Sequence, residues 1–492
     1  LVGGIFMPCT TILVGKKASN DGSTMIARND DGRFDVKKIK VVEKDKQPRK
    51  YVSKISHVEV ELPEHSLRYT TCPNVDPKYG IWAATGINEA NVGMSATETI
   101  TTNARVLGGD PYVKCEKKSK GKDEVKGGIG EEDLVVLVLP YIHSAREGVL
   151  RLGRLLEKYG TYEPNGIAFN DKNEVWWLET IGGHHWIAKR VKDEEYVIMP
   201  NQFGLDNFDF EDAFNEGKEN LCSKDLLEFI KDNNLDLEES KEFNPRVAFG
   251  SHSDADHVYN TPRGWYMARY FNPKTYKWEG DNADFTPESD DIPWSLVPEK
   301  KITIEDVKYI LSSYYQGTNY NPYLKHDYPE KGKYRPIGIS RTGVMAICQI
   351  RNNVPEEISA VEWLCFGSNA FNVCIPLYTN VDKMPNYVSN VSLDVSVDNF
   401  YWASRLIGVL CDAHYSNCLI YVERYQNTVA ALARQHIKEF DEKYIKSLDT
   451  NLLSKANEEL CKKVKVESQN LINTLTLVCS QEMKNGYSRF DN

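Results

Sequence analysis

Long hydrophobic runs, a basic charge balance and a regular cysteine framework are all missing from this sequence of 492 residues. The longest apolar run, 134–139, is far too short to cross a bilayer, so no membrane partner is expected. A net charge of −11 argues against a broad nucleic-acid-binding surface. The eleven cysteines include no CxxC pair, which predicts reduced thiols in a cytoplasmic protein.

Signatures for common cofactors are lacking as well. The glycine stretches VLGGD and KGGIGEED carry no Walker lysine in register, so phosphate binding is not expected. The segment GSHSDADHVYN brings together His252, Asp254, Asp256 and His257, but their spacing matches no standard zinc signature. A polar loop at the border of a cleft is the preferred interpretation. We therefore predict neither a metal nor another cofactor.

Strand patterns of period two dominate the N-terminal part of the chain. TTILVG and TMIARN flank the turn segment KKASNDGS, whose Asn-Asp-Gly favours a hairpin. NGIAFND, EVWWLET, HWIAKRV and EYVIMPN follow one another with short loops, which predicts an antiparallel meander. Helical periodicity in 131–160, and again after residue 397, alternates with these strands. The sequence therefore predicts an α+β protein with antiparallel sheets covered by helices.

Changes of pattern divide the chain into five predicted segments. Residues 1–8 lack the basic region and the length of a secretory signal and are interpreted as a propeptide or a leader remnant. Residues 9–204 and 331–385 carry the strands of the core. The aromatic, proline-rich residues 205–330 are predicted to form a loop-rich insertion with helices, and residues 386–492 a C-terminal helical extension.

Cys9 stands at the head of the first predicted strand. A hairpin folded about residues 19–21 places Arg28 and Asp31 of the second strand close to its thiol, and a neighbouring cation favours the reactive thiolate. Cleavage of the Pro8–Cys9 bond would also supply a base, because the freed α-amine titrates near neutral pH. A structural cysteine on a buried strand, with a surface Arg–Asp pair beyond it, is the alternative.

Several motifs carry a resemblance to a known family. CTTILVGKKASNDGSTMIARNDD resembles the start of the cysteine-type N-terminal-nucleophile (Ntn) dipeptidases, relatives of the penicillin V and bile-salt amidases and of the secernins. GINEANVGMSATET, MPNQF and HVYNTPRGWYMARYFNP also resemble this family and occur in its order. The resemblance runs from Cys9 to about residue 380. It implies a four-layer αββα sandwich, and hydrolysis of dipeptides through a thioester after autocatalytic removal of residues 1–8.

The resemblance also implies a set of catalytic residues. Cys9 is the nucleophile and, through its α-amine, the general base. Arg28 and Asp31 match side chains beside the nucleophile of the related amidases. Asn201, in MPNQF, matches an asparagine of the oxyanion hole, and Arg246, in NPRVAF, matches a later active-site arginine.

One departure from the amidases concerns substrate binding. Where they have a second oxyanion-hole asparagine, this sequence has Thr97-Glu98-Thr99. An ionised carboxylate cannot donate a hydrogen bond to an oxyanion. We therefore expect Thr97 and Glu98 to contact the substrate, with Glu98 binding the free α-ammonium of a dipeptide.

Three other functions remain open from the sequence. An N-acyl amidase of the penicillin V or bile-salt type would use the same nucleophile. A secernin-like interaction protein would keep the fold without hydrolysis, and a papain-like enzyme with a Cys–His pair would be fully active with residues 1–8 attached. The dipeptidase is preferred because Cys9, Arg28, Asp31 and Asn201 occur together. A homo-oligomer is compatible with each of these functions.

Overall fold

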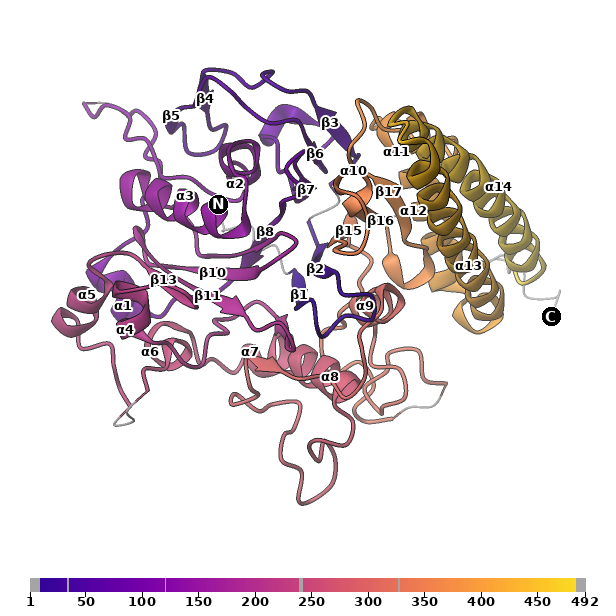
Figure 1. Cartoon of the computed structure of the whole chain (residues 1–492). Helices are drawn as coiled ribbons and strands as arrows, with labels where there is room; N and C mark the ends of the chain where they lie inside the picture. The colour runs from indigo at the N-terminus through magenta and orange to yellow at the C-terminus, as the bar shows by residue number, and fades with distance from the viewer. Residues whose placement is uncertain (1–8, 33–34, 120, 239–241, 326–327, 484–492) are drawn as a thin grey trace.

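Two antiparallel sheets form the centre of the protein (Figure 1). The computed structural model describes residues 9–32, 35–119, 121–238, 242–325 and 328–483. The seven strands of one sheet are, in spatial order, β14 (Ser295–Leu296), β12 (Tyr196–Met199), β1 (Thr10–Val14), β2 (Thr24–Asp30), β15 (Val344–Ile350), β16 (Ala360–Phe366) and β17 (Ile375–Tyr378). The six strands of the other are β13 (Asn220–Cys222), β11 (His185–Val191), β10 (Val175–Ile181), β9 (Asn165–Asn170), β8 (Gly93–Thr99) and β7 (Thr85–Ile87). Strand β2 packs against β8 and β9, so the sheets face each other and the α+β prediction is confirmed.

The first hairpin sets the position of the predicted nucleophile. Thr11 of β1 lies opposite Arg28 of β2, so the hairpin turns about residues 19 and 20, within the predicted range 19–21. The other edge of β2 pairs with β15, where Ala346 lies opposite Arg28, so β2 is an interior strand. Every residue of β1 and β2 is buried, because the sheet is covered on both faces.

The predicted four-strand meander is wrong for its last strand. β9, β10 and β11 pair in sequence order within the six-stranded sheet, but β12 crosses to the seven-stranded sheet and pairs with β1. Met199 of β12 lies opposite Thr11. Strand periodicity states only which residues share a face, not which sheet a strand joins. This crossing brings the MPNQF motif next to the strand that follows Cys9.

Helices and two small sheets surround this centre. The small sheets pair β3 (Lys40–Val42) with β6 (Tyr69–Thr71), and β4 (Lys50–Val52) with β5 (Glu59–Glu61). The α-helices are α1 (Ala104–Gly109), α2 (Leu134–Val138), α3 (Ala145–Tyr159), α4 (Phe210–Phe214), α5 (Leu226–Asp232), α6 (Pro245–Phe249), α7 (Asp256–Tyr259), α8 (Thr261–Phe271), α9 (Ile304–Leu311), α10 (Glu356–Ser359), α11 (Asn386–Ser389), α12 (Phe400–Ala413), α13 (Tyr415–Ser447) and α14 (Asn451–Gln481). Short 3-10 helices are η1 (Pro77–Tyr79), η2 (Leu139–Tyr141) and η3 (Asn369–Phe371).

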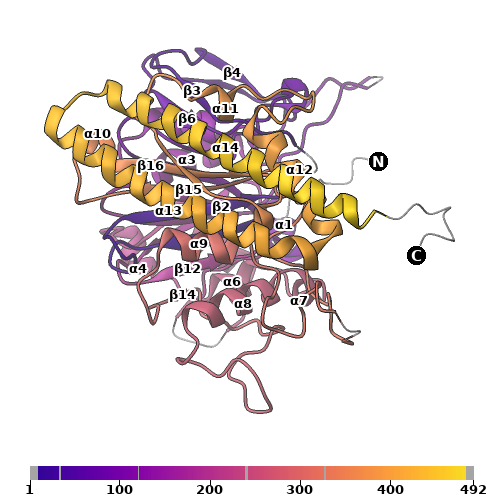
Figure 2. The same ribbon diagram turned by 90° about the vertical axis from the view of Figure 1, so that its right-hand side faces the viewer.

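Different helices cover the outer faces of the two sheets. α3 packs on β9, β10 and β11 of the six-stranded sheet, whereas α9 packs on β1 and β2. The long helices α13 and α14 run side by side across the seven-stranded sheet and contact β17 (Figure 2). They bury an apolar core that includes Phe440 and Leu475. The predicted helical character after residue 397 is thus confirmed.

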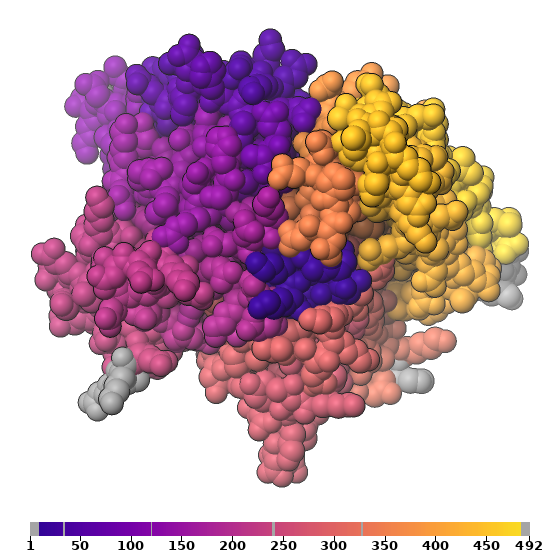
Figure 3. Space-filling view, viewed as in Figure 1, coloured from indigo at the N-terminus to yellow at the C-terminus, as the bar shows by residue number. Residues whose placement is uncertain are grey.

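The predicted segment 205–330 is not purely peripheral. It supplies β13 and β14 to the edges of the two sheets and α9 to the outer face of the first hairpin. α8 and the loop that follows it cover the lower side of the molecule, whereas α4 and α5 lie at its left side (Figure 1 and Figure 3). The division into five segments stays a prediction, and residues 1–8, with Pro8, lie outside the described residues. Among the described helices, none combines the length and apolar character needed to span a bilayer.

Candidate active site

The thiol of Cys9 lies between the two sheets, in contact with Arg28. Nη2 of Arg28 donates a hydrogen bond to Sγ of Cys9 over 2.9 Å. Both side chains are buried, with 0% of Cys9 and 3% of Arg28 exposed. Side chains alternate along a strand, so Arg28 faces the six-stranded sheet, whereas Asn29 faces α9 and donates to the carbonyl oxygen of Leu311. The register of the first hairpin therefore decides that the guanidinium meets the thiol.

Carboxylates and backbone carbonyls hold Arg28 in place. Nη2 also donates to Oε1 of Glu131 over 2.6 Å and lies 3.4 Å from Oδ1 of Asp30. Nη1 donates to the carbonyl oxygens of Ala84 and Ala96. A planar guanidinium satisfies these acceptors together, which a lysine ammonium does not. Oδ2 of Asp30 in turn pairs with Nζ of Lys37 over 2.6 Å.

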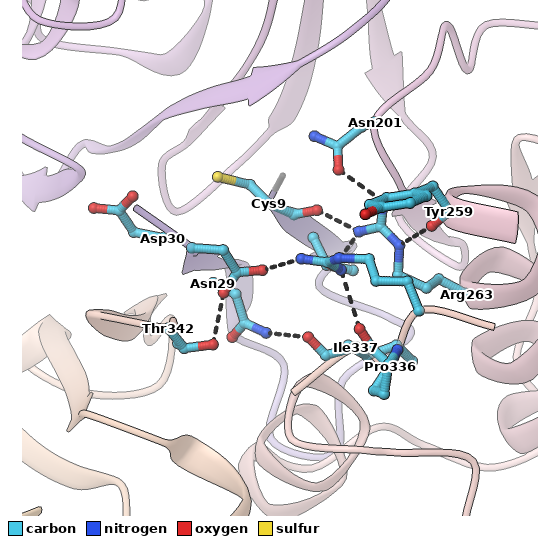
Figure 4. A network of polar contacts seen from close by, with 12 residues as sticks. Cys9, Asn29, Asp30, Asn201, Tyr259, Arg263, Pro336, Ile337 and Thr342 are labelled. Carbon is cyan, nitrogen blue, oxygen red and sulfur yellow. Dashed lines mark hydrogen bonds and ion pairs between the residues drawn. The ribbon is translucent and has the colours of Figure 1, made fainter. Parts of the chain in front are cut away.

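Arg263 holds the backbone of Cys9 from the other side. It lies in the first turn of α8, and its Nη1 donates to the carbonyl oxygen of Cys9 and to Oγ1 of Thr10. Its Nη2 donates to Oδ1 of Asn201 over 2.7 Å and to Oδ1 of Asn260 over 2.8 Å. In Figure 4 the carbonyl oxygen of Cys9 points at Arg263, and the sulfur points to the opposite side. The two arginines thus hold Cys9 by its thiol and by its carbonyl oxygen.

Asn201 and Asp31 belong to the same network. Nδ2 of Asn201 donates to the carbonyl oxygen of Thr99 over 2.9 Å, which uses one of its two hydrogens. Asp31, which is 0% exposed, accepts from Nη2 of Arg335 over 2.5 Å and from Oγ1 of Thr342 over 2.6 Å. Asp31 therefore ties the end of β2 to the chain before β15.

Glu98 is buried opposite the first strand. Its Oε2 accepts from Oγ1 of Thr11 over 2.7 Å, whereas its Oε1 and Oγ1 of Thr97 are buried without a hydrogen-bond partner in the described part of the chain. The pairing of β8 with β9 shifts register between Ala96 and Glu98. Such a bulge leaves its extra residue out of the ladder and redirects the neighbouring side chains. Two polar atoms of β8 are thus left unsatisfied in the described structure, on the strand that faces the first hairpin.

Burial is the main cause of the pKa shifts at this site. It raises the pKa of the Cys9 thiol well above its usual value; Arg28 opposes that shift. Burial likewise raises the pKa of Glu98 to about 8, although Arg263 and Thr11 oppose the shift. Burial also lowers the pKa of Arg263 to about 9, with the charge of a neighbouring arginine as the second cause. Burial therefore favours the neutral thiol of Cys9 over the thiolate.

A metal does not fit the polar groups around Cys9. The ligand atoms of Cys9, Asp30 and Glu131 lie within 4.8 Å of one another, which is compatible with an ion by distance alone. Nη2 of Arg28, however, contacts all three groups. Because a guanidinium cannot be deprotonated near neutral pH, it excludes a second cation from the same position.

Arg246 does not join this cluster. Its guanidinium donates to the carbonyl oxygens of Gly204, Asp290 and Ile292, so it braces the loop that follows MPNQF. The arginine that contacts Cys9 is Arg263, from another of the quoted motifs. α8 packs on β12, and Asn260 at its start donates to the carbonyl oxygen of Asn201, which brings Arg263 to Cys9.

Sequence reasoning missed several members of the site. Arg263 and Asn260 lie in HVYNTPRGWYMARYFNP, whose resemblance to the family points to no single residue. Glu131 lies in KGGIGEED, where the glycines suggest a phosphate loop rather than a role for the carboxylates. Asn260 and Arg263, three positions apart at the start of a helix with a first-turn proline, were the available signal.

Comparisons with known proteins give the family. The profile of peptidase family C69 matches residues 8–428. The chain belongs to this family. It is 48% identical to a dipeptidase of Bifidobacterium longum (strain NCC 2705), covering 99% of this chain and 100% of the relative. It is 49% identical to "Probable dipeptidase A" of Streptococcus pyogenes serotype M3 (strain SSI-1), over 99% of this chain and 100% of that relative. It is 46% identical to dipeptidase A of Lactobacillus helveticus, over 83% of this chain and 82% of that relative.

Membership of peptidase family C69 identifies a cysteine-type peptide hydrolase and confirms the enzyme prediction. A non-hydrolytic, secernin-like function thereby loses support. The hydrogen-bond partners of Cys9 within the described residues are Arg28 and Arg263, so the contacts of the thiol offer no support for a papain-like Cys–His pair. The recognition of the family from its motifs is confirmed.

Proposed function

We propose that this peptidase hydrolyses dipeptides with Cys9 as the nucleophile. The observation that carries the proposal is the 2.9 Å hydrogen bond from Arg28 to Sγ of Cys9 at the start of the central hairpin. A cation in that position stabilises a thiolate, which is the reactive form of a cysteine. The names of the relatives favour dipeptides over the N-acyl amides considered as the alternative.

The base is the α-amine of Cys9, freed by autocatalytic cleavage of the Pro8–Cys9 bond. Burial holds the thiol in its neutral form, and its neighbours Arg28 and Arg263 are cations that cannot accept a proton. An α-amine titrates at about 7.7–8.0 and lies on the same residue as the sulfur. It is therefore positioned to take the thiol proton without any movement of another element.

The proposed reaction proceeds through a thioester, and the α-amine of Cys9 carries the proton between its steps. The α-amine takes the proton of Sγ, and the thiolate attacks the carbonyl carbon of the scissile bond. Nδ2 of Asn201 donates to the oxyanion, and Asp31 and Arg28 orient the amine and the thiolate. The α-ammonium then gives its proton to the leaving nitrogen as the C–N bond breaks. Water, deprotonated by the amine, cleaves the resulting thioester and releases the thiol.

Glu98 selects a substrate with a free amino end. Its Oε1 and the hydroxyl of Thr97 are buried and without a partner in the described residues. Leaving such groups unpaired costs about 1–3 kcal/mol each, which binding of an ammonium recovers. An acylated amine carries no charge and makes weaker bonds to the same carboxylate. Glu98 thus distinguishes a dipeptide from an N-acyl amide.

The architecture supports the αββα assignment as well. The two facing sheets carry α3 on one outer side and α9, α13 and α14 on the other. We propose that these layers are the four-layer sandwich of the Ntn hydrolases, with the nucleophile at the start of a central strand. We also retain a cytoplasmic location as a proposal, because none of the eleven cysteines is in a disulfide.

Intact-mass analysis and hydrolysis of Ala-Ala test the proposal together. The full chain and its Cys9→Ala variant are produced with residues 1–8 in place. We expect the parent chain to lose residues 1–8 and to hydrolyse Ala-Ala, and the variant to do neither. Cys72→Ala is the matched control, because Cys72 is another fully buried thiol but contacts Glu362 instead of Arg28. An unprocessed parent chain with full activity would refute the role of the amine, and preference for an N-acyl amide would favour the amidase.

A further inference from the structure

Three side chains that commonly bind zinc meet on the surface, away from Cys9. His57 lies in the turn between β4 and β5, and Cys115 and Glu124 lie in the long connection between α1 and α2. Nδ1 of His57 is 2.7 Å from Oε1 of Glu124, and the ligand atoms of all three residues lie within 4.8 Å of one another. In Figure 1 this connection projects beside β5, at the edge of the molecule.

Backbone hydrogen bonds hold the three residues together. Glu116 and Val125 exchange hydrogen bonds of 2.9 and 3.0 Å, so the adjacent Cys115 and Glu124 are on paired arms of the connection. The amide of Gly127 donates to the carbonyl oxygen of Ser56 over 2.8 Å, which ties these arms to the turn that carries His57. Ligands that are distant in sequence are therefore brought together by main-chain contacts.

We propose that His57, Cys115 and Glu124 form a zinc-binding site. Imidazole, thiolate and carboxylate are all Zn²⁺ ligands, and three protein ligands leave the fourth tetrahedral position to water. Mg²⁺ and Ca²⁺ are disfavoured because they take oxygen ligands. On binding, the proton of the Cys115 thiol passes to solvent, and a thiolate–zinc bond forms without any oxidation or reduction. All three residues are partly exposed, so an ion reaches them from solvent.

The site is next to a segment that supports the nucleophile. Glu132 accepts hydrogen bonds from the amides of Lys54 and Ile55, in the same turn as His57. Its chain neighbour Glu131 is the carboxylate that holds Arg28 against Cys9. Zinc would therefore stabilise the connection and the turn at one end of this segment. Its binding does not depend on the proposed dipeptidase reaction, because no ligand belongs to the catalytic cluster.

Cobalt substitution tests the site without an activity assay. The full chain is treated with chelator, dialysed and titrated with Co²⁺, whose bond to a thiolate gives a charge-transfer band in the near ultraviolet. We expect one equivalent of Co²⁺ to bind and to produce this band. Added Zn²⁺ should displace the Co²⁺ and remove the band. Cys115→Ser should abolish the band, and His57→Gln and Glu124→Gln should each weaken Zn²⁺ binding by at least about 10-fold.

Cys222→Ser is the matched control, since Cys222 is the other cysteine of intermediate exposure. It should bind Co²⁺ as the parent chain does. Zn²⁺ should also slow tryptic cleavage at the lysines of the connection, such as Lys117 and Lys122, in the parent chain but not in Cys115→Ser. No band in the parent chain, or an unchanged band in Cys115→Ser, would overturn the proposal. Hydrolysis of Ala-Ala by the same samples reports separately on the reaction at Cys9.

Discussion

Replacing Glu98 by Gln tests how the enzyme selects its substrate. Oε2 of Glu98 accepts from Thr11 over 2.7 Å, and the amide oxygen of glutamine keeps that bond. What changes is the other atom, Oε1, which becomes an amide nitrogen that repels the α-ammonium of a dipeptide. The substitution thus removes one charge and preserves the shape of the site.

The size of the effect follows from the pKa of Glu98. A hydrogen bond between charged groups contributes about 1.5–3 kcal/mol. Burial raises the pKa of Glu98 to about 8, so ionising it at pH 7 costs about 1.4 kcal/mol. The net loss on substitution is therefore at most ~15-fold in kcat/KM at pH 7. At pH 8 the ionisation costs only about 0.4 kcal/mol, and the loss should rise to roughly 6–80-fold.

The pH dependence has a definite sign. Below pH 8 Glu98 must lose a proton before it binds the ammonium, and above pH 8 the substrate amine, with a pKa of about 7.7–8.0, loses its charge. The ratio of kcat/KM for Ala-Ala between the parent chain and Glu98→Gln should therefore peak near pH 8. The assay is hydrolysis of Ala-Ala and of N-acetyl-Ala-Ala from pH 6 to 9.

Glu362→Gln provides the control for this comparison. Glu362 is also fully buried, accepts from a threonine hydroxyl, Thr70, over 2.7 Å, and has a pKa that burial raises to about 7. It should leave the preference for Ala-Ala over the acetylated substrate unchanged. If Glu98→Gln kept the full preference and the same pH profile, Glu98 would not bind the ammonium.

Three further changes separate the roles of charge, ion pairing and packing. Arg28→Lys keeps the charge but loses a directed hydrogen bond to the thiolate of Cys9, worth about 1.5–3 kcal/mol, and should slow its alkylation by iodoacetamide ~10–100-fold at pH 7. Asp31→Asn removes the carboxylate that Nη2 of the buried Arg335 contacts over 2.5 Å and should lower the free energy of unfolding in urea by about 3–5 kcal/mol. Leu475→Ala opens a cavity under α14 and should cost about 2–5 kcal/mol of stability, with unchanged kcat per folded molecule.

For each of these three substitutions, one result would contradict the prediction. Unchanged alkylation of Arg28→Lys would mean that the guanidinium does not stabilise the thiolate. An unchanged urea midpoint for Asp31→Asn would mean that the ion pair contributes no net stability. Loss of kcat per folded molecule in Leu475→Ala would couple the C-terminal helices to the reaction.

Local patterns predicted the elements around Cys9 well. The turn KKASNDGS lies between two β-rich stretches, so the hairpin follows from short-range chemistry, and its observed register centres the turn within the predicted residues 19–21. The long amphipathic helices near the C-terminus were also predicted from a short-range pattern, the helical period of their apolar residues. The path of β12 was not visible, because its four residues fit either sheet equally well.

The sequence by itself determined the family, through the order of its motifs, and it placed Arg28 beside Cys9, because both residues belong to one hairpin. Only the tertiary structure decided that Arg263, and not Arg246, holds Cys9, and that Glu131 braces Arg28. Those contacts join residues more than a hundred positions apart. Their partners are chosen by how the two sheets and α8 pack together, which no local pattern in the chain records.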